Sequence, residues 1–212
     1  SGNVKIKGLP EISDVFIDAD INRLYTSLND AVKINIPTAD TLINLEFPEH
    51  IMNLQYVDFQ GRFTGFVNDF VTYGDIKTSM GTVSADINIK TTNGFDYSGD
   101  LSTQSFQLGK LINVSDQVGN ISMNLSVIGS GFEPQTMSVS ARGSVAHLEI
   151  RGYDYTNIDI DGELNKMEFL GAVNVADSNL NLAFNGAVDF KPKIPQIKAE
   201  CDIKRLKLAP LN

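Results

Sequence analysis

Residues 180–190, Leu-Asn-Leu-Ala-Phe-Asn-Gly-Ala-Val-Asp-Phe, decide the fold class of this chain. The even-numbered positions hold apolar residues or glycine, and Asn181, Asn185 and Asp189 stand between them. Because successive side chains point to opposite faces of a β-strand, the pattern predicts a strand with one apolar and one polar face. At about 3.3 Å per residue this strand is roughly 35 Å long.

The same alternation recurs along the chain, and long helical periodicity is missing. Its clearest cases are residues 83–90, 121–127, 139–145 and 197–204. Turn-forming residues at 129–131 (Gly-Ser-Gly), 161–162 (Asp-Gly) and 176–179 (Ala-Asp-Ser-Asn) suit tight reversals between antiparallel strands. The sequence therefore predicts an all-β chain that runs as an antiparallel meander.

Two short segments interrupt this pattern with single helical turns. Residues 27–32 have Ser27 as a candidate N-cap, and residues 105–112 repeat the same arrangement of a strand that runs into a turn of helix. We therefore expect one or two short helical turns and a weak internal repeat.

Composition excludes several kinds of partner. The 212 residues carry a formal net charge of −9 and give a pI near 4.6, which disfavours binding to nucleic acid because phosphate contacts need clustered Lys and Arg. No stretch approaches the roughly 20 apolar residues of a membrane-spanning helix. A single cysteine allows no internal disulfide, so the fold must be stable by packing alone.

No residue pattern predicts an enzyme, a cofactor or a metal site. His50 and His147 lie far apart in the sequence without cysteines or paired acids beside them. Cys201 occupies the apolar phase of its strand, where it reads as a small core residue and not as a nucleophile. We therefore expect no catalytic residues, no metal and no cofactor.

Glycine-punctuated motifs recur along the chain. Two long stretches are Gly-Arg-Phe-Thr-Gly-Phe-Val-Asn-Asp-Phe at 61–70 and Tyr-Gly-Asp-Ile-Lys-Thr-Ser-Met-Gly-Thr at 73–82. Shorter segments follow at 97–101, 106–111, 152–158, 160–162, 169–171 and 177–180. In this order the segments resemble the TamB-like (AsmA-like) family of envelope proteins, with Ser178 where proline is usual. Together the matches run from about Tyr25 to Leu208, nearly the whole chain.

The resemblance implies a fold and a cellular role. The fold is an elongated, twisted antiparallel sheet curled into a trough, which is described as β-taco-like. Residues 1–212 are then one repetitive β segment of a larger protein, with a candidate sub-boundary near 112–120. The implied place is the periplasm of a Gram-negative bacterium, with the full-length protein anchored in the inner membrane.

The implied function is non-enzymatic: a hydrophobic groove that supports lipid transport between the inner and outer membranes, outer-membrane protein assembly, or both. The implied partners are lipid acyl chains and, through regions outside this segment, outer-membrane assembly machinery. A carrier must give continuous apolar contact, because each methylene exposed to water costs about 0.8 kcal/mol. The expected groove lining is Val83, Ile87, Ile89, Ile121, Met123, Leu125, Val127, Ile158, Ile160, Leu164, Phe169, Val173, Val175, Leu180, Leu182, Phe184, Val188, Phe190, Ile197 and Ile203.

A closed β-sandwich is the alternative. Alternation by itself is what any half-buried sheet shows, and taken alone it favours a sandwich that binds saccharide or another protein at a cell surface. Such a site needs clustered exposed aromatic residues, whereas this chain has no Trp and its Phe residues fall mostly on apolar phases. The resemblance favours the open trough.

Overall fold

Twelve antiparallel strands form one open sheet. The computed structural model describes residues 1–8, 14–37, 42–44, 49–92 and 94–209. The strand order is β1-β2-β5-β6-β7-β8-β9-β10-β11-β12-β13-β14, and β3 and β4 form a separate two-stranded sheet. The strands are β1 Gly2–Lys7, β2 Phe16–Ser27, β3 Asn35–Pro37, β4 Leu42–Asn44, β5 Tyr56–Phe66, β6 Asp69–Thr78, β7 Gly81–Lys90, β8 Asp96–Phe106, β9 Val118–Ser130, β10 Ser138–Ile150, β11 Tyr153–Asn165, β12 Glu168–Ala176, β13 Leu180–Asp189 and β14 Gln196–Leu206; the helices are α1 Leu28–Ala31, α2 Glu49–Met52 and α3 Leu108–Leu111.

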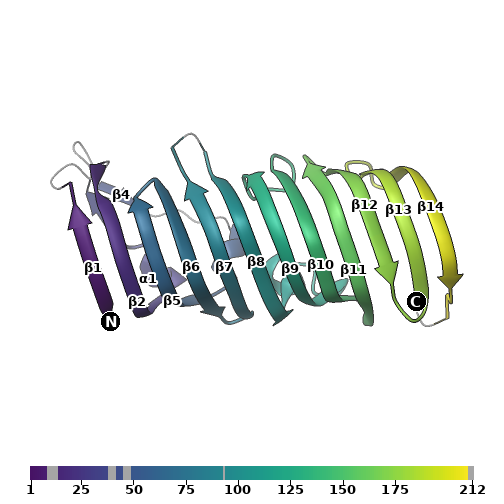
Figure 1. Cartoon of the computed structure of the whole chain (residues 1–212), viewed down its shortest axis with the longest axis horizontal. Helices are drawn as coiled ribbons and strands as arrows, with labels where there is room; N and C mark the ends of the chain where they lie inside the picture. The colour runs from purple at the N-terminus through teal and green to yellow at the C-terminus, as the bar shows by residue number, and fades with distance from the viewer. Residues whose placement is uncertain (9–13, 38–41, 45–48, 93, 210–212) are drawn as a thin grey trace.

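The predicted fold class is confirmed. Figure 1 shows the strands side by side along the long axis of a twisted, trough-like sheet. The twelve-stranded sheet is open, and the other sheet of the described residues is only the two-stranded β3–β4 pair, so these strands do not form the two facing layers of a closed sandwich. No helix in the described ranges is long and apolar enough to cross a membrane.

The helices are single turns at strand ends. Ser27 caps α1 as predicted, because its Oγ accepts a hydrogen bond from the backbone N–H of Asp30 at 3.1 Å. The helix α3 follows β8 in the same way that α1 follows β2, as the repeat of strand and helical turn predicts. A third turn, α2, lies within the excursion between β2 and β5 and was not predicted.

Strand register collects the alternating residues onto one face. Because directly paired residues lie on the same side of a sheet, each set of partners forms a row across the strands. We call the side that carries these rows the apolar face, and the opposite side the polar face. One row from β7 to β14 is Val83, Thr103, Met123, Val145, Ile158, Val175, Leu182 and Ile203.

Another row on the same face consists of small residues. It runs through Ala141, Gly162, Gly171, Gly186 and Ala199 on β10 to β14. A Cβ on Gly171 would overlap the Cα of Gly162, so glycine lets these two backbones approach each other here. The predicted reversal at 161–162 is therefore wrong, because Asp161 and Gly162 lie within β11 and the glycine serves close strand packing.

The polar face is held by ion pairs and hydrogen bonds between neighbouring strands. Arg142 Nη2 lies 2.6 Å from Asp161 Oδ2 on the adjacent strand, and Lys90 Nζ lies 2.8 Å from Asp69 Oδ2. Ser84 donates to Asp75 Oδ1 at 2.6 Å. These groups stay in water, so the polar face needs no cover.

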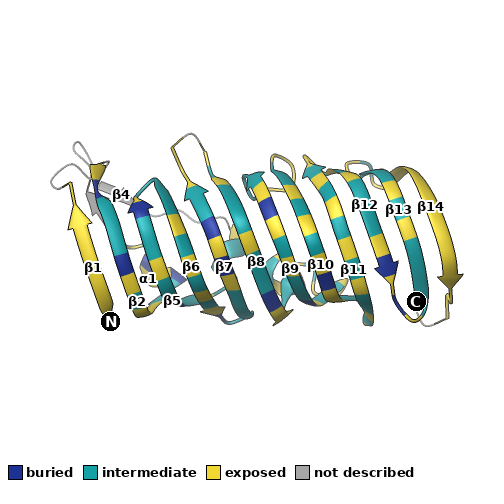
Figure 2. Cartoon of the chain, in the orientation of Figure 1, coloured by how far each residue is buried: buried dark blue, intermediate teal, exposed yellow. Residues whose placement is uncertain are grey.

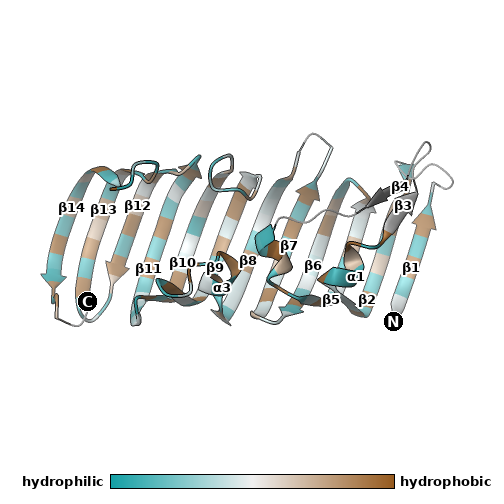
Figure 3. Ribbon diagram, turned by 180° about the vertical axis from the view of Figure 1, so that it is seen from behind, coloured by the Kyte–Doolittle hydropathy of each residue, from teal (hydrophilic) through white to brown (hydrophobic). Residues whose placement is uncertain are grey.

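Only one cluster of buried residues forms a filled core among the described residues. Met80, Phe106, Ile121 and Val145 are its buried members, on the apolar face near one end of the central strands. Side chains of α3 pack against it, and Figure 3 shows α3 on this side of the sheet. No side chain in the described part of the chain is less than 2% exposed, as expected for a single layer.

Candidate functional site

The predicted groove-lining residues all follow the phase of the apolar face. Strand pairing joins those within β7, β9, β11, β12, β13 and β14 into continuous rows, and Phe190 lies just after β13. The buried members are Ile87, Ile121, Val127 and Val175, the exposed members are Phe190, Ile197 and Ile203, and the remaining members are half-buried. The position of each residue along the sheet determines how much of its side chain is exposed to solvent.

The central part of the apolar face is covered by the chain itself. Val83, Met123, Leu125 and Ile158 pack against the core cluster together with Leu54 and α3. The Asn53 side-chain amide donates to the carbonyl of Leu111 at 3.1 Å, which joins the segment after α2 to the end of α3. These predicted lining residues therefore contact protein at this end of the strands.

Aromatic residues outside the prediction also lie on the apolar face. Phe63 and Phe70 stack with ring centroids 4.5 Å apart, and Tyr97 stacks on Phe132 at 5.7 Å. The alternation Phe59-Gly61-Phe63-Gly65 could have identified Phe63, because all four residues share one phase. Phe132 lies in the connection between β9 and β10, where strand periodicity gives no signal.

The apolar face is bare over β11 to β14, apart from Ile158, which packs against the core cluster. In the described part of the chain these four strands make extensive contacts only with neighbouring strands, and no helix lies over them (Figure 3). One open row is Ile160, Val173, Phe184 and Cys201. Phe169 and Phe184 stand 6.3 Å apart on this surface, which we call the bare apolar face. It carries most of the predicted lining residues, from Ile158 to Ile203.

The structure corrects the interpretation of Cys201. Its phase is the apolar one, as predicted, but its thiol is exposed and not part of a core, because β14 is the outermost strand and no other strand of the described residues pairs beyond it. His147 Nδ1 lies 2.9 Å from Asp154 Oδ2 on the surface, and His50 lies 3.8 Å from Glu133. Among the described residues no group of His, Cys, Asp and Glu could hold a metal ion.

A buried carboxylate fixes the turn between β12 and β13. Asp177 is 4% exposed and accepts hydrogen bonds from the Tyr153 hydroxyl, from Thr156 Oγ1 at 2.9 Å and from the backbone N–H of Asn179 at 2.8 Å. Burial raises the pKa of Asp177, but these hydrogen bonds outweigh it and lower the pKa to about 2. The turn predicted at 176–179 is thus confirmed and tied to β11.

Shallow hollows lie on the opposite, polar face. One of about 720 Å³ is lined by Asp75, Ser84, Ser102, Asn124 and Ser144, among others. It forms where short serine side chains stand beside longer polar ones, and it is open to water. Polar residues make up most of its lining, so the open surface of the bare apolar face is the better candidate site for an apolar ligand.

Comparisons of this sequence with family models, with curated proteins and with solved structures find no match.

Proposed function

We propose that this chain is a non-enzymatic, TamB-like segment of a periplasmic protein, whose bare apolar face holds lipid acyl chains during transport between the inner and outer membranes. One observation carries the proposal: register aligns the apolar residues of four successive strands, and no other part of the described chain covers them. The sequence resemblance to the TamB-like family gives the cellular setting.

The dimensions of the bare apolar face suit one acyl chain. Strands lie about 4.8 Å apart, so β11 to β14 span about 14 Å across their axes. One leaflet of a bilayer's hydrocarbon core is about 15 Å thick, which is the reach of one acyl chain. Each methylene that leaves water for this surface contributes about 0.8 kcal/mol when fully buried. An open face covers only one side of the chain, so binding is weak enough for movement along it.

The test is lipid binding by variants of β13. Leu182→Asp with Phe184→Arg places two charges on the bare apolar face, and Ala183→Asp with Asn185→Arg places the same charges on the polar face of the same strand. We expect the first variant to lose the lipid found by mass spectrometry in organic extracts of the purified chain, while the control keeps it. Circular dichroism checks that both retain strand content.

Two results would contradict the proposal: an absence of lipid in extracts of the unchanged chain, or equal lipid content in both variants. The predicted role in outer-membrane protein assembly gives a different outcome in the same assay. In that case an unfolded peptide with alternating apolar residues would displace the lipid from the unchanged chain. The same peptide would bind the Leu182→Asp, Phe184→Arg variant more weakly, and it would bind the control variant as well as the unchanged chain.

A further inference from the structure

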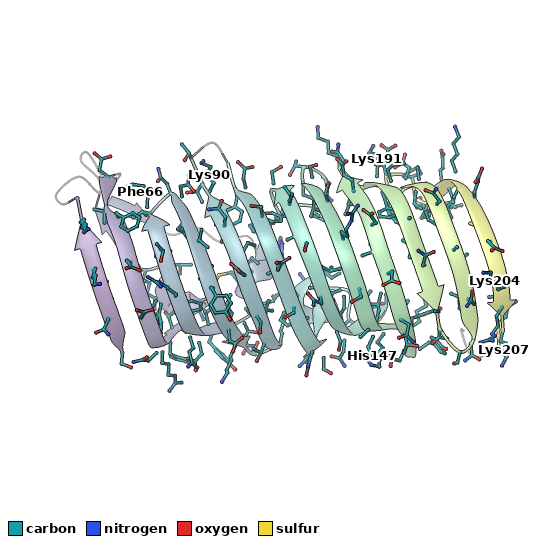
Figure 4. The ribbon with its side chains drawn as sticks, viewed as in Figure 1. Phe66, Lys90, His147, Lys191, Lys204 and Lys207 are labelled. Carbon is teal, nitrogen blue, oxygen red and sulfur yellow. The ribbon has the colours of Figure 1, made fainter. Side chains whose placement is uncertain are left out.

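The short helix α2 contacts connections at both ends of a central strand. The strand ends form two long edges of the trough, which we call its lips, and Figure 4 shows Lys90 and Lys191 along one lip and His147 along the other. Asn113 lies in the connection before β9 and Glu133 in the connection after it, so these two residues stand at opposite lips. Both are within reach of residues 50–53.

One side of this segment is firmly attached. The Asn53 side-chain amide donates to Asn113 Oδ1 at 2.9 Å and to the carbonyl of Leu111 at 3.1 Å. Two residues further on, the carbonyl of Gln55 accepts a hydrogen bond from the backbone N–H of Leu28 at 2.9 Å. All these partners lie at the lip where β8 continues into α3, which we call the α3 lip. The segment after α2 is therefore anchored there.

The contact with the opposite lip is loose. His50 Nδ1 lies 3.8 Å from Glu133 Oε1, and the Glu133 side chain is 58% exposed. Within the described ranges this is the one polar contact between residues 49–55 and the connection from β9 to β10. A charge pair this open to water stabilises little. The attachment of α2 is thus strong on one side and weak on the other.

The curvature of the sheet explains how one helical turn reaches both lips. If β9 were straight, its 13 residues would span about 40 Å, whereas a turn of helix rises only about 5.4 Å. The strand therefore bends, and its two connections lean towards each other across the apolar face. Ile121 near the start of β9 and Val127 near its end are both buried on the inside of this bend (Figure 2). The helix α2 lies across the mouth of the bend.

The helix α2 crosses this mouth without becoming part of the core. None of its four residues is buried, and it makes extensive contact with no strand in the part of the chain that the structure describes. In contrast, α3 contacts β9 extensively and packs against the core cluster. A helix of four residues is not stable by itself. Its position therefore depends on its contacts at the two lips.

We propose that α2 is a latch over the central groove, anchored through Asn53 at the α3 lip and released where His50 meets Glu133. The closed latch separates the bare apolar face from the stacked Phe63 and Phe70 on β5 and β6. The open latch joins these surfaces, so an acyl chain can move from one to the other. The ligand in this inference rests on the proposed function, whereas the motion of the latch does not.

Distances between two spin labels on the full chain test the latch without lipid. Glu49→Cys labels the first residue of α2, Gln135→Cys labels the connection from β9 to β10, and Cys201→Ser removes the native thiol. Pulsed electron paramagnetic resonance should then give a short distance for the closed latch and a longer one for the open latch. Circular dichroism checks that the labelled chain is folded.

Removal of Glu133 should shift this equilibrium. We expect Glu133→Ala to raise the ratio of long to short distances roughly twofold, because the released contact is an exposed one. The matched control is Glu168→Ala, since Glu168 begins β12 at the same lip and forms its ion pair with Lys191. This control should leave the ratio unchanged.

Vesicles of dioleoylphosphatidylcholine connect the latch to lipid. This lipid has no net charge, so a chain with a net charge of −9 is not repelled from it. We expect the vesicles to increase the long distance in the labelled chain, and Glu133→Ala to retain more lipid per chain than Glu168→Ala. Mass spectrometry of organic extracts measures the retained lipid.

Either of two results would overturn the latch: a single distance that is the same in the labelled chain and in Glu133→Ala, or an equal change in Glu133→Ala and Glu168→Ala. Failure of the proposed function has a different signature. No chain then retains lipid, while the two distances and their dependence on Glu133 persist.

Discussion

The central strands and the last four strands share the same alternation of apolar and polar residues, but their apolar faces differ in what covers them. In β8 to β10 the apolar phase is covered by α3 and by the segment after α2, and it forms a filled core around Phe106 and Ile121. In β11 to β14 the same kind of residue stays half-buried or exposed, apart from Val175. Alternation thus determines which face is apolar, whereas short elements outside the strands determine whether that face becomes core or remains available to a ligand.

Truncation of one phenylalanine in each region gives the largest expected contrast. Phe106 is 6% exposed, so Phe106→Ala should lower the free energy of unfolding by about 3–4 kcal/mol. Phe184 is half-buried on the bare apolar face, so Phe184→Ala should cost about 1–2 kcal/mol. Urea unfolding followed by circular dichroism measures both. Equal losses would mean that the last four strands are packed as tightly as the centre.

Acid should act on the bare region through Asp177. Its pKa is lowered from 3.8 to about 2 in the folded chain, so its contribution to stability is present above about pH 4 and is lost as the pH falls towards 2. The shift corresponds to about 2 kcal/mol. We expect Asp177→Asn to be less stable at pH 7 and to show a smaller further loss between pH 4 and pH 2. Urea midpoints across this range provide the measurement, and parallel pH curves for the two proteins would rule out this role.

A methyl group in the row of small residues tests how the bare region holds its strands. The Cβ of Gly171→Ala would meet the backbone of Gly162, so we expect a loss of about 1–2 kcal/mol. Ala172→Ser changes the next residue, on the polar face, and serves as the control. If Gly171→Ala and this control unfold at the same temperature, the two strands can move apart to make room for the methyl group without loss of stability.

The smallest effect is expected on the polar face. Ile128 is 68% exposed there, although it stands in a central strand. Replacement by Thr should change the free energy of unfolding by less than about 0.5 kcal/mol. Thermal unfolding at neutral pH measures this change. A larger loss would indicate that a partner or a second copy covers the polar face. The polar face would then also count as a covered surface when the two regions are compared.

Period-two alternation in the sequence was sufficient to predict the strands and their two faces. The strands around 83–90, 121–127, 139–145 and 180–190 are present, with ends extended or shortened by a few residues. The turn at Asp177 was also predictable, because its Asp and Asn form hydrogen bonds within the turn itself.

Other features depend on contacts distant in sequence. Gly162 looks like a turn residue, but its role is set by Gly171 across the strand pair. Cys201 looks like a core residue, but exposure follows from its place in the outermost strand. Which lining residues α3 covers depends on where a four-residue helix packs, and local sequence does not specify this. These features are therefore determined by contacts between strands and helices distant in sequence, and alternation along a single strand does not predict them.

The strictly sequential strand order from β5 to β14 has a consequence for how the chain folds and evolves. Apart from β5, which pairs with β2 and β6, each of these strands pairs only with the strands before and after it in the sequence, so loop closure is short at these steps and contact order is low. The sheet can grow hairpin by hairpin from one end. Its length is also free to change by duplication or loss of a hairpin, since no distant strand needs to be re-paired.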